Sequence, residues 1–442
     1  MQKLDNKGFM VAGVIYSILL LFVIVFSALI TLLANRKNVL DSTNNEIKEE
    51  INNSDQSGLG GVDNSGGGSP VLSSNMVGIT LTEQGKVIVA DTSNSKWYNY
   101  SSGIWANAVV LKAGVTAPEP GNVIPMENIN QMYVWIPRFK YKLFNPAGEE
   151  VEKQRIEIEF ESKTTMPSTG DYTDEWLTHP AFRLGGNEEI SGFWIGKFEI
   201  SDGNKMIPNV NSIGKKSIGY FYNQIKTLNP AGTDNVHVMK NTEWGATAYL
   251  SQSKYGICKD LVCSNKIASN NIHEERTYNI TTGCSNGPSG KAVAGGICPE
   301  DGRWYTLKGK KATTTQNIYG VYDMVGGRAE YVMGAMKDST NTNVLVLTSE
   351  FNQTILNGLS PKFLNVYNYG TLPTDNTRSL LGDATIETKI WSSGKKDFVK
   401  TDSGWFMRGG RANGSESSIW DYDANGGRPY PGNSTRAAIF GY

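Results

Sequence analysis

The residues best suited to chemistry lie in the closing segment, 405–442, and the chemistry that they suit is recognition. This segment mixes Ser, Tyr, Trp, Asp, Asn, Gly and Arg without a helical or strand period. Rigid aromatic rings supply contact area and small polar side chains supply adaptable hydrogen bonds, as in binding surfaces built on loops. Ile419, Ile439 and the turn at Arg408-Gly-Gly are expected to be scaffold. The expected ligand contacts are Arg411, Asn413, Glu416, Trp420, Tyr422, Asn425, Arg428 and Tyr430.

Two other kinds of site are conceivable in the same chain. Asp421 and Asp423 flank Tyr422, with Glu416 nearby, and a carboxylate pair could act as general acid and base in glycoside cleavage. Carboxylates this close in an irregular loop more often make hydrogen bonds in turns, which favours a structural role. The three histidines are widely separated, so we expect no multi-His metal site. The net charge of -1 does not suggest nucleic acid as a partner.

Four cysteines lie close together in a stretch rich in Gly, Ser and Asn: Cys258, Cys263, Cys284 and Cys298. None forms a Cys-x-x-Cys pair, which disfavours a zinc site or a redox motif. Two disulfides that staple an irregular loop fit the pattern, with four reduced thiols as the alternative. Three pairings are open, and we favour Cys258 with Cys263 and Cys284 with Cys298 because they are neighbours.

An uncharged, almost wholly apolar run extends over 9–34. It is long enough to span a bilayer as a helix and longer than the apolar part of a secretory signal. We therefore expect a single-pass protein at the cell membrane, with the bilayer as partner of 9–34 and the cysteine-bearing body extracellular. The Gly- and Ser-rich stretch 53–75 is typical of a flexible linker.

The body begins with a small β-rich module, expected over 76–115. Short strands are predicted at 79–82 and 86–90, followed by a hairpin whose arms contain Trp97 and Trp105. These two rings could form a platform for carbohydrate, although we favour the alternative that they fill a small core.

A larger, loop-rich domain is expected over 125–442. Its predicted elements are a buried strand at 132–137, a strand at 192–200 and a helix at 243–252. In the second strand Lys197 and Glu199 alternate with apolar residues, which predicts one solvated face. The whole chain is therefore assigned to the α+β class: an N-terminal transmembrane helix, a small β module and the larger domain.

The elements of the larger domain resemble, in order, the formylglycine-generating (sulfatase-modifying) enzyme family, whose fold is a variant of the C-type lectin fold. The similarity covers roughly 133–442. Its motifs are Phe193-Trp-Ile-Gly-Lys197, the helix at Trp244, Tyr319-Gly-Val-Tyr-Asp-Met324, Arg408-Gly-Gly and the closing Ser434-Thr-Arg436.

The resemblance also bears on catalysis. The family's enzymes use cysteines between the Arg-Gly-Gly turn and the final Arg, whereas in this sequence no cysteine follows Cys298. We therefore expect no enzyme, and an oxidase of this type is the second alternative. Asp323-Met-Val-Gly-Gly327 lacks the family's Asn, so calcium is not supported and no cofactor is expected. The segment 405–442 instead resembles the variable region of the non-catalytic surface-display branch of this fold.

The N-terminus, Lys7-Gly8-Phe9-Met10, resembles the leader of type IV prepilins. This implies a leader over 1–8, cleavage between Gly8 and Phe9, and a pilin-like helix over 9–52. The acidic residue that the family carries five positions after cleavage is replaced by Gly13. The leading expectation is a surface-anchored, adhesin- or receptor-like protein that binds an unknown extracellular protein or glycan. A minor pilin or pseudopilin in a pilus-type assembly is the first alternative.

Overall fold

The computed structural model of the chain describes most residues after 68 and, before that, only Ser27 and Thr31. Contacts divide the chain into a unit over Met1–Gly61 and a unit over Val62–Tyr442, and all the strands and helices named below lie in the second. The described residues are 27, 31, 69–93, 97–143, 155–164, 176–185, 187–228, 235–259, 281–284, 298–325, 327–345, 351, 353–370, 380–389, 391, 394–409 and 418–442.

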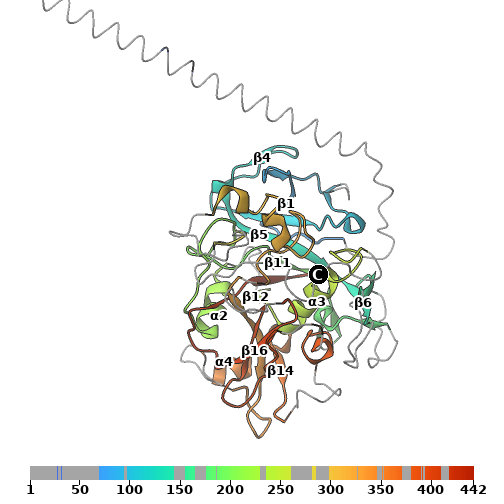
Figure 1. Cartoon of the computed structure of the whole chain (residues 1–442), viewed down its shortest axis with the longest axis vertical. Helices are drawn as coiled ribbons and strands as arrows, with labels where there is room; N and C mark the ends of the chain where they lie inside the picture. Colours follow the sequence, from blue (N-terminus) through green and yellow to red (C-terminus); the bar gives the residue numbers. More distant parts are fainter. Residues whose placement is uncertain are drawn as a thin grey trace, which may run out of the picture. The chain divides into compact units, whose positions relative to one another are not determined.

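An antiparallel sheet of eight strands is the largest element (Figure 1). In spatial order its strands are β12 (Val236–Val238), β18 (Ala437–Gly441), β11 (Gly192–Gly196), β5 (Ile129–Pro137), β3 (Asn107–Leu111), β1 (Met76–Leu81), β2 (Val87–Val89) and β4 (Val123–Ile124). Because β3 pairs with β5, with Val109 opposite Met132, the module expected over 76–115 is part of the same sheet as the larger domain.

The middle of this sheet is formed by apolar runs that are buried on both faces. All of β11 and nearly all of β5 are buried, as expected for continuous apolar strands inside a domain. Trp194 lies opposite Trp135, and their ring centroids are 5.2 Å apart. A Cβ atom at Gly441 would lie 2.1 Å from the Trp135 ring, so glycine is required there for the indole to fit.

A second sheet has five strands, in which β14 (Asn365–Tyr367), β13 (Ala329–Met336), β15 (Trp405–Arg408) and β16 (Tyr422–Asn425) lie side by side and β17 (Asn433–Ser434) also pairs with β13. The smaller sheets are β7 (Glu157–Phe160), β6 (Phe139–Lys142) and β8 (Leu177–Thr178), and the pair β9 (Arg183–Gly185) and β10 (Glu188–Glu189). The β15–β16 pair belongs to the segment in which ligand contacts are predicted.

Three α-helices occur in the described residues: α2 (Ile218–Lys226), α3 (Asn241–Ser251) and α4 (Gln353–Gly358). At the start of α3 the Glu243 carboxylate caps the helix by accepting the Lys240 backbone N–H at 2.8 Å. Every residue of α3 is buried, so the helix has no solvated face and is packed on all sides.

The predicted fold class is wrong in the part of the chain that the structure describes. That part is mostly β rather than α+β, and none of its helices has the length and apolar character needed to cross a membrane. The predicted transmembrane helix, and with it the single-pass location at a cell membrane with an extracellular body, is contradicted by this finding. The run 9–34 lies outside the described residues except for Ser27 and Thr31, and the leader residues Gly8 and Phe9 lie outside them entirely.

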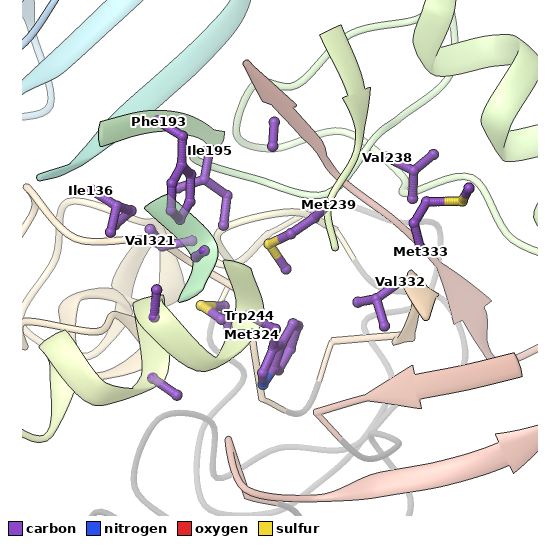
Figure 2. Close-up of a cluster of buried hydrophobic side chains, with 14 of the residues drawn as sticks. Ile136, Phe193, Ile195, Val238, Met239, Trp244, Val321, Met324, Val332 and Met333 are labelled. Atoms are coloured by element: carbon purple, nitrogen blue, oxygen red, sulfur yellow. The ribbon is translucent and has the colours of Figure 1, made fainter. Parts of the chain in front are cut away.

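The main core lies where the large sheet, α3 and the second sheet meet (Figure 2). Trp244 of α3 packs there with Met324, which belongs to the turn before β13. Figure 2 draws these side chains together with Ile136, Phe193, Ile195, Val238, Met239, Val321, Val332 and Met333. A second cluster lies under β1, β2 and β4 and includes Trp304 and Phe198.

The solvated face predicted for the strand at 192–200 is wrong. Lys197 and Glu199 are fully buried. The Lys197 ammonium donates to the carbonyls of Ile318 and Gly320 at 2.7 and 2.9 Å, and it lies 5.3 Å from the centre of the Tyr322 ring. Burial lowers the pKa of Lys197 well below its usual value. Alternation alone does not distinguish a buried cation with carbonyl partners from a solvated one.

We predict opposite outcomes for alanine at two helical glycines. A Cβ atom at Gly245 in α3 would lie 1.9 Å from the Gly382 carbonyl, whereas one at Gly358 in α4 would meet nothing within 4 Å. Helix propensity alone favours alanine at both by about 1 kcal/mol. Gly245→Ala should nevertheless destabilise by about 1–3 kcal/mol because of the clash, and Gly358→Ala should be neutral or stabilising. Urea unfolding of both variants measures this, and equal effects would contradict the close packing of α3 against Gly382.

Candidate ligand-binding site

The structure separates the predicted contact residues into three groups. Trp420 and Tyr422 are buried, with exposed fractions of 0% and 1%. Asn425, Arg428 and Tyr430 lie at the surface or half-buried. The others lie outside the described residues; they are Arg411, Asn413 and Glu416.

Trp420 and Tyr422 occupy core positions in this structure. The Trp420 ring lies edge-on to Trp391 with centroids 5.0 Å apart, and Tyr249 is 6.0 Å away. Tyr422 begins β16 opposite Arg408 of β15, whose guanidinium is 5.8 Å from its ring. The closing segment therefore runs through the core at 418–422 before it returns to the surface, which a sequence without periodicity could not indicate.

Arg408 and Gly409 of the predicted scaffold turn are buried, Gly410 lies outside the described residues, and the arginine is part of a buried hydrogen-bond network. The Arg408 guanidinium donates to Asn241 Oδ1 and to the carbonyls of Asp383 and Ala384 at 2.7–2.8 Å. Gly409 has φ +80°, and a Cβ atom there would lie 2.1 Å from the Met324 carbonyl. This network fixes the start of the closing segment against α3.

Two segments that are distant in sequence meet at the surface and run past one another. The Ile218 N–H donates to the Gly427 carbonyl at 3.0 Å, and the Lys215 N–H donates to the Tyr430 carbonyl at 3.1 Å. The Asn433 side chain accepts from the Lys216 N–H at 3.4 Å and donates to the Lys216 carbonyl at 2.7 Å. We call the resulting region the closing-loop surface; its side chains are Lys215, Lys216, Tyr220, Arg328, Asn425, Arg428 and Tyr430.

Tyr331 and Arg328 fix the backbone of the closing loop by hydrogen bonds. The Tyr331 hydroxyl of β13 donates to the Arg428 carbonyl at 2.8 Å and also bonds Asn425. The Arg328 guanidinium donates to the Ser212 hydroxyl at 2.9 Å and to the Pro431 carbonyl. The loop is thus bound along its backbone while Arg428 is exposed. Sequence reasoning found the loop but missed its partners, because nothing in the sequence connects them.

A buried cluster of carboxylates lies behind Arg328. Glu199 Oε1 accepts the Arg328 backbone N–H at 2.8 Å. Glu330 forms an ion pair with Arg436, and the Asp323 carboxylate accepts the Gly283 N–H at 2.7 Å. Burial, followed by the charges of Glu330 and Asp323, raises the pKa of Glu199 to about 8, so its carboxyl is protonated at neutral pH.

Asp421 and Asp423 do not form an acid–base pair in the structure. The Lys396 ammonium donates to Asp421 at 3.0 Å, and Lys395 pairs with Asp423 at 2.8 Å. Asp421 is buried and its carboxylate also accepts the Ser418 N–H, so both groups are held by their own lysines. No group of three His, Cys, Asp or Glu residues in the described part is placed to hold a metal ion.

The predicted disulfide between Cys284 and Cys298 is confirmed, with a Cα–Cα distance of 5.7 Å. Cys258 is also disulfide-bonded, and its predicted partner Cys263 lies outside the described residues. Trp97 and Trp105 of the aromatic hairpin fill a core, as the favoured alternative predicted, and do not form an exposed platform. Both are buried, and the ring centroids of Trp97 and Trp194 are 6.4 Å apart.

Comparison with known proteins adds no family to this description, since neither the protein-family models nor the curated proteins include a match to the chain.

Trp420 is predicted to behave as a core residue. Replacing it with alanine should destabilise the protein by about 3–5 kcal/mol, as should Trp194→Ala in β11, because each leaves a large buried cavity. Tyr430→Ala should change the melting temperature little. Thermal melts of the three variants are the measurement. A native-like melt for Trp420→Ala would contradict the core position of this ring.

A second prediction concerns the Glu199 proton. The folded protein keeps it up to about pH 8, whereas the unfolded chain releases it near the ordinary value of 4.5. Stability from this group is therefore present at low pH and falls as pH rises from about 4.5 to 8. Glu199→Gln, which cannot ionise, should lack this pH dependence. The unfolding free energy of the wild type minus that of the variant should decrease as the pH is raised from about 5 to 8. A difference that stays constant would show that Glu199 ionises normally.

Proposed function

We propose that the unit over 62–442 is a non-catalytic ligand-binding domain that resembles the C-type lectin fold of the formylglycine-generating type. The ligand contacts lie on the closing-loop surface, through Arg428, Tyr430 and Asn425. The collinear motifs of the resemblance support the fold, and the three described cysteines, which are all disulfide-bonded, offer no thiol for oxidase chemistry.

The observation that carries the proposal is that the closing loop is fixed by hydrogen bonds to its backbone, which leaves its side chains available at the surface. Its backbone is bound by Ile218, Lys215, Tyr331 and Arg328, while its arginine is exposed and its tyrosine half-buried. A loop that is already ordered loses little entropy on binding, so its side chains can contribute fully to affinity. Arginine and tyrosine are also the residue types that most often carry binding energy at interfaces.

The test uses the full chain on an array of glycans and proteins. Ligands that bind should lose about tenfold or more in affinity with Arg428→Ala or Tyr430→Ala, without a change in melting temperature. Lys112→Ala and Tyr369→Ala are matched controls, because both side chains are exposed and lie outside the closing-loop surface. Ligands that bind both loop variants as tightly as wild type would place the site elsewhere and refute the proposal.

A further inference from the structure

The closing-loop surface carries cations that form no ion pair with the described residues. Some cations elsewhere in that part of the chain are paired, as Lys140 is with Glu159 and Lys395 with Asp423, both at 2.8 Å. None of the ion pairs found there involves Lys215, Lys216, Arg328 or Arg428. The acidic neighbours of Arg328 are Glu199, which is buried, and Asp202, and the backbone of Asp402 lies near Gly426, so the four cations outnumber the three acidic residues close to them. The surface has a net positive charge that a ligand could neutralise.

Lys215 has a backbone conformation that does not suit lysine. Its φ is +59°, in the left-handed region, where a side chain costs about 1 kcal/mol relative to glycine. The neighbouring Lys216 lies with its ammonium 4.5 Å from the centre of the Tyr220 ring, which orders that cation beside an aromatic face. A strained position that nevertheless holds an exposed charge indicates a use for the charge at the surface rather than in the fold.

The backbone of the loop leaves no edge for an extended peptide. Pro429 and Pro431 have no N–H to donate. The carbonyls of Gly427, Arg428, Tyr430 and Pro431 already accept hydrogen bonds from within the protein. Recognition by strand addition therefore has few donors and acceptors to use along this stretch. What remains are the cationic side chains of this surface and the rings of Tyr220, beside which Lys216 lies, and of the half-buried Tyr430.

We infer that the closing-loop surface binds an anionic polysaccharide. Its carboxylate or sulfate groups would pair with Lys215, Lys216 and Arg428, and its sugar rings would pack their apolar faces on Tyr220 and Tyr430. This inference rests on the proposed function and specifies the ligand class of the same surface. Each exposed pair contributes modestly, so several anionic groups along one chain are needed for useful affinity.

The experiment measures binding of the full chain to four probes: heparin, hyaluronan, neutral dextran and polyglutamate. Heparin and hyaluronan should bind, dextran should not, and raising NaCl from about 0.05 to 0.5 M should weaken binding because exposed charges are screened. Lys215→Gly and Arg428→Ala should each weaken heparin binding by about threefold, and both together with Lys216→Ala by more than about tenfold. Lys112→Ala should have no effect.

Lys215→Gly also separates binding from folding. Because glycine accepts positive φ, the variant should keep or raise the melting temperature while it loses affinity. Loss of affinity with a lower melting temperature would assign Lys215 to structure and overturn its role. Polyglutamate that binds as tightly as heparin would assign the surface to acidic peptides instead. If array ligands depend on Tyr430 but not on salt or Lys215, only the polysaccharide inference fails. If they depend on neither Arg428 nor Tyr430, the proposed function fails as well.

Discussion

The ion pair between Arg436 and Glu330 joins the parts of the fold on which the surface loops depend. Arg436 precedes β18, and both Nε and Nη2 donate to the Glu330 carboxylate of β13, with Nε at 2.7 Å. Its Nη1 donates to the carbonyl of Gly196, the last residue of β11, at 3.0 Å. One guanidinium thus connects the eight-stranded sheet with the five-stranded sheet. Removing one partner of such a pair leaves a buried charge and typically costs about 3–5 kcal/mol.

The closing-loop surface is attached to the region where Arg436 and Glu330 connect the two sheets. β17 lies just before Arg436 and pairs with β13 next to Glu330, so the end of the loop is fixed where the two sheets meet. Glu199, three residues beyond Gly196, fixes the backbone of Arg328, whose side chain reaches the loop at Pro431. The loop is therefore fixed to the core by hydrogen bonds of a few polar side chains rather than by apolar packing.

Much of the framework can be predicted from sequence because its signals are local. The strands containing Trp135 and Trp194, the helix containing Trp244 and the bond between Cys284 and Cys298 are all indicated by neighbouring residues alone. The burial of polar residues cannot be predicted in this way. Lys197 and Glu199 would alternate with apolar residues in the same pattern whether their side chains pointed into a core or into solvent. The α+β class and the membrane-spanning helix are wrong for the described part of the chain.

The candidate site can be predicted only in part, for a different reason. Residue type singles out Arg428 and Tyr430, and the same criterion wrongly favours exposure of Trp420, which is fully buried. Lys216 contacts Asn433 across 217 residues of sequence, and no local pattern can report such a pairing. A single sequence identifies side chains that are suited to recognition, but not the distant segment that completes their surface.

The position of β18 has a consequence for how the protein is made. This strand lies between β12 and β11 in the large sheet, although both are synthesised about two hundred residues earlier. While the ribosome is still translating the intervening chain, the edge of β11 stays unpaired and its apolar residues, including Phe193 and Ile195, lack their final cover. Such an edge is a site for mispairing between nascent chains. The sheet therefore stays open at this edge until β18 has emerged and inserted.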